Sequence, residues 1–529
     1  MTYDSYLFFA AYALIVLGIY LLFPLKYRWT VLLGAGALFC GFLNGPVALW
    51  VLACAGFAYV SARHLTTLQD RFAKEKKDLS KDERKALKAR YTRRKKWTAA
   101  GGIVGALSIL LVLKYCNFFI GQINPLLSLF GVTEGIPFLS LALPMGISYY
   151  TLQAIGYIID TYRGVCRAEK NFFKLLLFVS FFPQMTEGPI ARYGQLAPQL
   201  TEGHRYSNEN FTGGVTLILW GFFKKIVISD RASFMASEVF DNSASYGTFA
   251  LITAAVLYTV QLYTDFSGCI DIMSGTARMF GIRLPENFRQ PFFSHSVGEF
   301  WRRWHISLGT WFKDYVFYSV SLSAPFMKLS KAASAKLNKF LAALLPSSCA
   351  LLIVWLGTGL WHGADMKYVV YGLYYFLIMF LGSLVDPLGA KAAQKWGFDR
   401  KKGVFGALAV ARTILLVIIG MIMFRAGSLE EFANYLWGIV SRVNYGELTG
   451  GVLLCLGTDT PDFIVIGAGA VMMLIVGIMK ERGTDVLQTV AKGPIYIKWS
   501  VMLGLIAVIL VFGAYGPNYG PVDNIYAQF

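Results

Sequence analysis

Two histidines are the residues most suited to chemistry in this chain, which has only five histidines in all. His305 lies in the stretch Glu299-Phe-Trp-Arg-Arg-Trp-His-Ile-Ser307, and His362 lies near the end of a long uncharged run, in Leu360-Trp-His-Gly363. Ionisable side chains are costly inside apolar runs, so each one is a functional hypothesis. The alternative for each is a hydrogen bond between two helices, worth about 0.6 to 2 kcal/mol.

A neutral imidazole is well suited to proton transfer. Its unperturbed pKa of about 6.5 lets it take a proton at physiological pH and return it within one cycle. Apolar surroundings disfavour the charged ring and so favour the neutral base. Each of the two histidines follows a tryptophan, Trp304 or Trp361. These flat rings could form the wall of a site or stack on a sugar or an acyl chain.

Other kinds of chemistry lack the residues that they need. The sequence has no Gly-x-Ser-x-Gly elbow, so it does not support a serine hydrolase. It has no His-Glu-x-x-His motif and no Cys-x-x-Cys pair, so we expect no metal site. His64 and His204 lie in polar stretches that are typical of surface residues, whereas His295 follows a proline turn and a role for it stays open. The pattern therefore favours base-assisted transfer, in which a histidine activates a hydroxyl group against an activated acyl donor.

Charged residues near the first histidine could complete such a site. Arg302, Arg303 and Lys313 flank His305. They could meet the phosphates of a cytoplasmic donor such as a coenzyme A thioester, or anchor the chain at a membrane surface. Asp265 ends an apolar run, and a buried carboxylate normally has a partner. We expect Asp265 either to orient an imidazole or to neutralise an arginine.

The composition shows which scaffold must position these residues. The chain has 529 residues, of which 56% are hydrophobic and 15% are charged, whereas soluble domains carry about 25% charged residues. A soluble protein of this composition would expose apolar surface that it could not cover. The sequence therefore predicts an all-α, polytopic membrane protein embedded in a lipid bilayer. It disfavours a disordered chain, a nucleic-acid-binding globule and a disulfide-stabilised secreted domain.

Apolar runs and their interruptions predict the helices. About eleven runs are candidates for membrane spans. The run over residues 29–62 is broken by Asn44-Gly-Pro46, so it predicts two short spans. The stretches Leu141–Ser148 and Phe182–Ile190 combine proline and glycine with polar groups, and such backbone must be buried in protein or line a wet cavity. We expect about eleven transmembrane helices, with re-entrant and amphipathic helices around a central funnel.

Half of the net charge of +18 lies in one segment. Between Arg63 and Lys96, 14 basic residues minus 5 acidic residues leave +9. The positive-inside rule makes this segment cytoplasmic, and it makes Lys224 and Lys225 look like further cytoplasmic anchors. Three parts follow for a multi-pass protein of the cell membrane: N-terminal spans at 1–62, a basic cytoplasmic loop at 63–96 and a membrane core at 97–529.

The basic segment contains a helix start signal. Ser80 and Glu83 have the spacing of a capping box, and good helix formers follow over Lys81–Lys96. A helix with so few apolar residues is either solvated or lies on anionic headgroups, where each basic residue is worth about 1 kcal/mol. A topology determinant without chemistry is the simpler interpretation of this segment.

Eight short motifs lie between about residue 140 and the end of the sequence. They are Phe181–Gln184, Gly188–Ile190, Gly221–Asp230, Asp265–Gly268, Pro285–Phe293, Glu299–Ser307, Leu360–Gly363 and Ile525–Phe529. Together they resemble the membrane-bound O-acyltransferase family, and within it the bacterial subgroup of alginate O-acetylases and teichoic acid D-alanyl transferases. The resemblance implies that His362 is catalytic and that His305 is a second family histidine near it. It makes candidates for substrate binding of Trp304, Trp361, Arg302, Arg303, Lys313, Asp265 and Gln184.

The resemblance also implies a direction of transfer. We expect an acyl group, in the first place acetyl from acetyl-CoA, to enter from the cytoplasm as a thioester and to pass toward a glycan outside. An extracytoplasmic acyltransferase or a small membrane protein would complete the delivery, with no bound cofactor. Three alternatives stay open: D-alanyl transfer to teichoic acid, a transporter of polysaccharide or lipid-linked sugar, and a structural subunit of an envelope complex.

Overall fold

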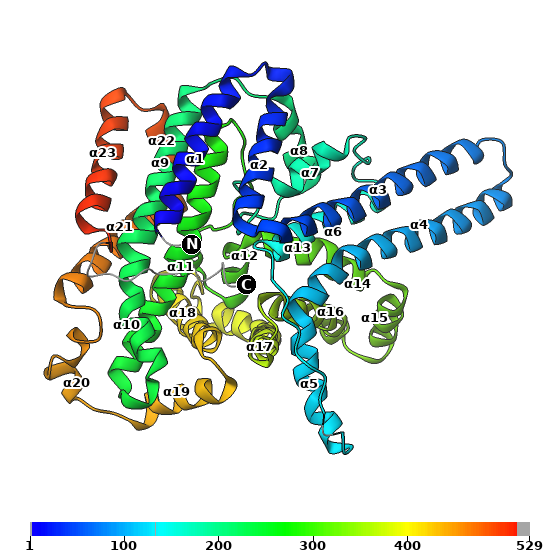
Figure 1. Cartoon of the computed structure of the whole chain (residues 1–529). Coiled ribbons are helices and arrows are strands. Elements are labelled where there is room, and N and C mark those ends of the chain that lie inside the picture. The colour runs from blue at the N-terminus through cyan, green and yellow to red at the C-terminus, as the bar shows by residue number, and fades with distance from the viewer. Residues whose placement is uncertain (1–2, 133, 516–529) are drawn as a thin grey trace. The chain divides into compact units, whose positions relative to one another are not determined.

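The computed structural model describes residues 3–132 and 134–515 (Figure 1). Most of these residues are helical, and among them we find no strand beyond one isolated antiparallel bridge between Phe288 and Trp304. The all-α prediction is therefore confirmed. The motif at 525–529 lies outside the described residues.

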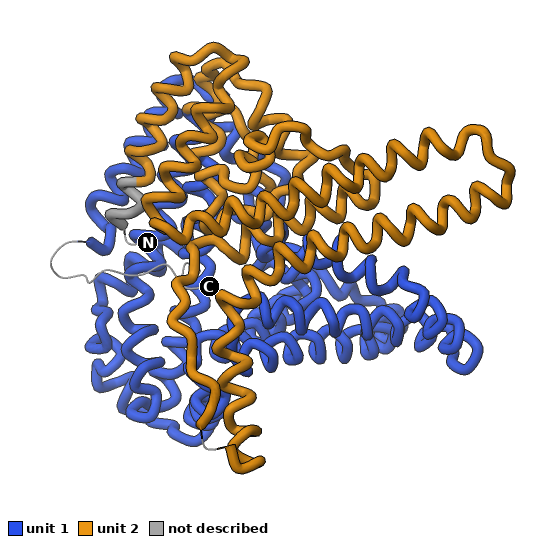
Figure 2. The backbone as a smooth tube through the Cα atoms, turned by 45° about the vertical axis from the view of Figure 1, so that its right-hand side comes forward, with its two compact units in different colours: residues 1–7, 212–275, 286–529 blue, residues 8–211, 276–285 orange. Residues whose placement is uncertain are grey.

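The chain forms two compact units, which Figure 2 shows in different colours. Unit 1 comprises residues 1–7, 212–275 and 286–529, and unit 2 comprises residues 8–211 and 276–285. These units are groups of mutual contacts. The three-part division at residues 62 and 96 concerns membrane topology instead, and it stays a prediction.

Nine helical segments of the described chain are long and apolar enough to cross a membrane. The sequence predicts about eleven, and part of the difference is that Leu25–Glu75 counts as one segment and that the apolar helix Phe9–Leu22 is too short to be counted. Two further runs contribute for a physical reason. The apolar runs near 135–159 and 172–186 form α6 (Ile147–Arg163) and α7 (Phe172–Ser180), of 17 and 9 residues. A span needs about 20 residues, and irregular backbone takes up the rest of each run. The polytopic prediction is confirmed.

Unit 2 contains a long helical hairpin. α3 and α4 pack on each other and on α6, and the hairpin extends away from the rest of the unit (Figures 1 and 2). A 3-10 turn at Gly45–Ala48 separates α2 from α3, as the Asn44-Gly-Pro46 break predicts. The capping box of Ser80 and Glu83 is also confirmed at the start of α4. Besides α6 and α7, the part of the chain up to residue 202 contains the helices α1 (Tyr3–Leu22), α2 (Arg28–Asn44), α3 (Leu49–Glu75), α4 (Lys81–Leu110), α5 (Cys116–Leu129) and α8 (Tyr193–Glu202).

Unit 1 is organised around α11, α16, α17 and α18, with two short helices, α12 and α13, between α11 and α16 in the chain. Its core is rich in aromatic rings; for example, Trp355 stacks on Tyr375 with ring centroids 5.3 Å apart. α9 (Asn208–Phe222) crosses from unit 2 into unit 1. The other helices are α10 (Asp230–Asp241), α11 (Thr248–Met279), α12 (Val297–Arg303), α13 (Ile306–Phe312), α14 (Tyr318–Ser321), α15 (Ala324–Lys336), α16 (Lys339–His362), α17 (Met366–Trp396), α18 (Gly403–Arg425), α19 (Leu429–Ser441), α20 (Gly446–Thr449), α21 (Thr460–Glu481), α22 (Val486–Lys492) and α23 (Ile495–Phe512).

Candidate active site

The turn that carries His305 is held in an unusual conformation. His305 joins α12 to α13 with a φ of 45°, in the left-handed region that residues with a Cβ atom rarely adopt. The preceding loop pairs with this turn: Phe288 forms a bridge to Trp304, and the amide of Ile306 donates to the carbonyl of Asn287 at 3.0 Å. The backbone around His305 is therefore fixed from two sides.

A buried asparagine also contacts the His305 ring. Asn287 Oδ1 lies 3.1 Å from His305 Nδ1 and accepts from the amide and the hydroxyl of Ser307, at 3.2 Å and 2.8 Å. All three residues are at least 97% buried. The motif Pro285–Phe293 contains this asparagine, but no feature of its spacing pointed to His305.

His362 is the last residue of α16, and the glycine that follows explains the Trp-His-Gly motif. A Cβ atom on Gly363 would meet the ring of Tyr368, so only glycine lets the chain leave the helix here. The His362 ring is buried and packs against the edges of two aromatic rings. Its centroid lies 5.3 Å from that of Phe424 and 5.9 Å from that of Tyr371.

The ring of Trp361 contacts both histidines. Its centroid lies 5.7 Å from that of His305 and 5.1 Å from that of His362. His305 is outside the candidate spans, and burial lowers its pKa well below the usual value, with a further contribution from His362. His305 is therefore neutral at physiological pH. The structure brings together the two histidines that the sequence singled out.

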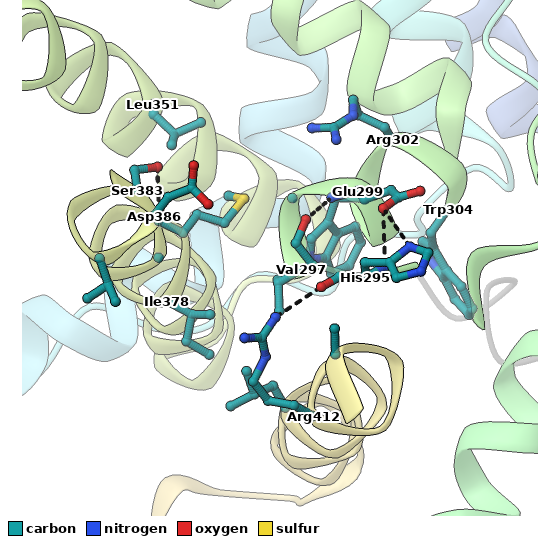
Figure 3. Close-up of a pocket in the computed structure, with 18 of the residues that line it drawn as sticks. His295, Val297, Glu299, Arg302, Trp304, Leu351, Ile378, Ser383, Asp386 and Arg412 are labelled. Carbon is teal, nitrogen blue, oxygen red and sulfur yellow. Dashed lines mark hydrogen bonds and ion pairs between the residues drawn. The ribbon is translucent and has the colours of Figure 1, made fainter. Parts of the chain in front are cut away.

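Both histidines line a cavity of about 2080 Å³ in unit 1. Figure 3 shows another part of its lining, which includes Arg302, Trp304 and His295. Its walls come from α12, α13, α16, α17 and α18. Arg302 and Lys313 line it, and neither forms an ion pair with the described residues. Trp304 and His295 also line it. The cavity thus places the two histidines on one surface with two cations.

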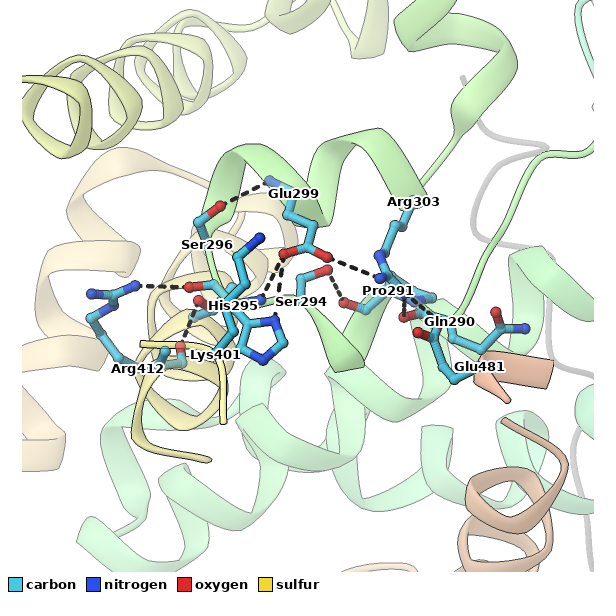
Figure 4. A network of polar contacts seen from close by, with 12 residues as sticks. Gln290, Pro291, Ser294, His295, Ser296, Glu299, Arg303, Lys401, Arg412 and Glu481 are labelled. Atoms are coloured by element: carbon cyan, nitrogen blue, oxygen red, sulfur yellow. Dashed lines mark hydrogen bonds and ion pairs between the residues drawn. The ribbon is translucent and has the colours of Figure 1, made fainter. Parts of the chain in front are cut away.

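One wall of the cavity is held by a polar network (Figure 4). Glu299 accepts from the amide of His295 at 3.1 Å and from the guanidinium of Arg303 at 2.9 Å. Arg303 also pairs with Glu481, and Arg412 donates to the carbonyl of His295 at 2.9 Å. Arg303 does not line the cavity. Its two ion pairs make it part of the network that supports the wall, and a contact of Arg303 with substrate stays a prediction.

Asp265 pairs with a lysine, whereas the sequence suggested an arginine or an imidazole. Lys225 Nζ lies 2.8 Å from Asp265 Oδ1 and 2.8 Å from Asp230 Oδ1, and the lysine is fully buried. The residue after Asp265 reaches the site: the Phe266 ring meets the His305 ring edge-on, with centroids 4.9 Å apart. Asp265 therefore supports the site through its neighbour.

Lys224 and Lys225 differ from their sequence interpretation as surface anchors. Both are buried, and Lys224 forms its own ion pair with Asp271 at 2.7 Å. The aspartates nearby in the sequence were the available signal, because a buried lysine needs carboxylates within reach. Gln184 belongs to unit 2, where its side chain donates to the carbonyl of Phe178 at 3.0 Å.

Comparison with known proteins identifies the family. The family model described as membrane-bound O-acyltransferase matches residues 167–424. A probable alginate O-acetylase of Pseudomonas putida is 30% identical over 441 residues, which cover 81% of this chain and 83% of that protein. The chain belongs to the membrane-bound O-acyltransferase family. This confirms the resemblance and makes the protein a multi-pass membrane protein of an acyltransferase family.

The names of other relatives mention different acceptors. A probable alginate O-acetylase of Pseudomonas syringae is 35% identical over 364 residues, covering 67% of this chain and 64% of that protein. The match thus spans less than two thirds of that relative's length. A peptidoglycan O-acetyltransferase of Helicobacter pylori is 30% identical over 390 residues, covering 69% and 67%. More distant relatives are named teichoic acid D-alanyltransferases.

Proposed function

We propose that this protein is an O-acetyltransferase of the cell membrane that modifies a polysaccharide of the cell envelope or the exterior. The observation that carries the proposal is the pair of buried histidines, His305 and His362, on either side of Trp361 and lining one cavity. Family membership supports acyl transfer, and the names of the relatives support acetyl groups and glycan acceptors.

In the proposed reaction His362 acts as the general base. Its neutral ring takes the proton from an acceptor hydroxyl while the hydroxyl oxygen forms a bond to the acyl carbon of a thioester. The carbon–sulfur bond then breaks, and the imidazolium returns the proton to the leaving thiolate. The products are an O-acyl ester and a free thiol, so the histidine ends the cycle in its starting form.

The cations of the cavity support a donor that carries phosphates. Arg302 and Lys313 line the cavity without ion pairs to the described residues, so both can pair with a ligand. The pyrophosphate and the 3′-phosphate of acetyl-CoA are groups of this kind. The donor is a substrate and leaves as the thiol.

Transfer across the membrane is the second part of the proposal. The basic segment at 63–96 lies in the cytoplasm by the positive-inside rule, and the donor enters from that side. The acceptor glycan lies outside, and an extracytoplasmic acyltransferase or a small membrane protein receives the acyl group for delivery. Neither step needs a metal or a bound cofactor of the protein.

Substitution of His362 tests the proposal directly. In purified protein supplied with labelled acetyl-CoA, His362→Ala should abolish thioester consumption, because the proposed reaction assigns the proton transfer to this ring. His295→Ala is the matched control, since His295 lines the same cavity but its ring lies beside Glu299. Equal expression of the variants is checked in membranes. Full activity of His362→Ala would remove the catalytic assignment, and glycan movement without acylation would favour the transporter alternative.

D-alanyl transfer is the second candidate, because some relatives carry that name. The same preparation is offered a D-alanyl thioester of a carrier protein in place of acetyl-CoA. If only the D-alanyl donor is consumed, the function is D-alanyl transfer and not acetyl transfer. The proposed role of the histidine would stay the same.

A further inference from the structure

The hydrogen bonds around Asn287 determine the proton position on a site histidine. Three groups converge on Asn287 Oδ1: the Ser307 amide, the Ser307 hydroxyl and His305 Nδ1. An asparagine side chain has one acceptor oxygen and one donor nitrogen, and either atom can in principle face a ring nitrogen. The identity of the facing atom therefore decides which tautomer the ring adopts.

The Ser307 amide resolves this choice. A backbone N–H can only donate, so the atom it meets must be the asparagine oxygen. An amide oxygen can only accept, so His305 Nδ1, 3.1 Å from the same oxygen, must carry a hydrogen. When the ring is neutral, the lone pair then lies on Nε2. The backbone of α13 thus sets the tautomer of His305 through Asn287.

We propose that Asn287 is a positioning residue that keeps His305, whose ring lines the cavity, in the Nδ1–H tautomer and so leaves Nε2 as the acceptor atom of that ring. This inference rests on the proposed acyl transfer. With its lone pair on Nε2, His305 accepts a hydrogen bond from a second hydroxyl of the acceptor glycan, and the reacting hydroxyl keeps its single hydrogen for His362. In the other tautomer the ring would offer a donor there instead, and the second hydroxyl would lose this acceptor.

The backbone around His305 explains why such a device is needed. With a φ of 45°, the residue is in a sparsely populated conformation that persists only where the surroundings over-determine it. Asn287 provides two of these restraints: its carbonyl accepts from the amide of Ile306, and its side chain holds the ring. The same residue thus fixes both the position and the proton of the imidazole.

A kinetic cycle with His305 distinguishes positioning from a merely structural role. Asn287→Ala should lower kcat for labelled acetyl-CoA by about 10- to 100-fold, the usual effect of losing the partner that orients a functional histidine. The KM for the donor should stay unchanged. In the His305→Ala background, Asn287→Ala should cause no further loss, because there is no ring to orient. A further loss of similar size in that background would overturn the proposal.

Asn287→Asp provides the conservative variant. A carboxylate accepts the same three hydrogen bonds but adds a negative charge, which raises the pKa of His305. The ring then becomes protonated at higher pH, so the acidic limb of the pH–rate profile should move to higher pH. Ser307→Ala is the control: it removes one donor but keeps the bond to His305, and its kcat should stay within about threefold of wild type. An unshifted profile in Asn287→Asp contradicts the proposal.

A measurement independent of activity separates this inference from the proposed function. With five histidines, uniform ¹⁵N-histidine labelling gives a resolvable spectrum, and the His305 signals are those lost in His305→Ala. We expect wild type to show a protonated Nδ1 and an unprotonated Nε2. The opposite tautomer overturns the role of Asn287 even if acyl transfer occurs, whereas an inactive wild type with the expected tautomer overturns only the proposed function.

Discussion

Two regions of this molecule contain basic residues that are neutralised to very different extents. In unit 1, Lys225 is fully buried between the carboxylates of Asp230 and Asp265. In unit 2, the segment Lys81–Lys96 of α4 carries 9 basic and 2 acidic residues, and its basic groups form no ion pair among the residues that the structure describes. Both regions read as basic clusters in the sequence.

The difference teaches that burial decides what a lysine does. A buried ammonium group loses its hydration, so it persists only with carboxylates in contact, and removing one partner leaves an uncompensated charge. An exposed lysine keeps its hydration and needs no partner. One face of α4, lined by Lys85, Lys88, Arg93 and Lys96, is open to solvent and to whatever anionic surface lies beside it.

Breaking the buried cluster should have the largest effect. Lys225→Met leaves Asp230 and Asp265 close together without a cation, and we expect a loss of about 3 to 5 kcal/mol of stability. Thermal unfolding of the purified protein in detergent measures it. Neutralising both aspartates in the same chain, as Asn, should restore much of the loss. Wild-type stability of Lys225→Met alone would show that the buried pair is not needed.

The cavity wall provides an intermediate case, because Glu299 is only partly buried. Glu299→Gln weakens the charge-assisted contacts to Arg303 and to the amide of His295, and we expect a loss of about 1 to 2 kcal/mol of stability, measured as a lower midpoint of thermal unfolding. Arg289→Gln is a control, since its ion pair with Glu286 is exposed. A loss of stability no larger than that of the control would show that Glu299 does not stabilise the cavity wall.

The pH dependence of Glu299 sharpens this case. Burial raises the pKa of its carboxyl, but the His295 amide and Arg303 lower it by more, so the pKa lies below its usual range. A lowered pKa gives stability that is present above the unfolded value of about 4.3 and is lost as the pH falls through the folded value. The difference between wild type and Glu299→Gln should therefore shrink in acid, as unfolding midpoints between pH 7 and pH 3 would reveal. A difference in unfolding midpoint that stays constant between pH 7 and pH 3 would contradict this prediction.

Removing exposed charge should have the smallest effect on folding. We expect the exchange of four residues for Gln, Lys85, Lys88, Arg93 and Lys96, to change the free energy of unfolding in detergent by less than about 0.5 kcal/mol, since exposed groups without partners contribute little. Four exposed lysines on and beside α15 provide a control of equal charge: Lys328, Lys331, Lys336 and Lys339. A large destabilisation by the α4 exchange alone would mean that these residues pack rather than stand in solvent.

Much of the architecture could be predicted from the sequence because it depends on local properties. Low charge and long apolar runs are enough to predict membrane helices, and the Asn44-Gly-Pro46 break and the Ser80–Glu83 capping box act within one turn of helix. The irregular backbone of Phe182–Ile190 was also predictable, since proline and glycine disfavour a helix wherever they occur. His305 and His362 were found because ionisable residues are rare in apolar runs.

The partners of those residues could only come from the tertiary structure. Lys225 looked like a cytoplasmic-side anchor, and nothing in the sequence showed that Arg303 pairs with Glu481, because a sequence records a charge but not its hydration or its partners. Asn287 drew no attention, since an asparagine in a loop is ordinary until a ring nitrogen is found beside its oxygen. Helix and span signals are local along the chain, whereas ion pairs and tautomers depend on residues that only folding brings together. The sequence by itself therefore determined the membrane scaffold and its two histidines, and the tertiary structure decided which groups hold them and in which protonation form.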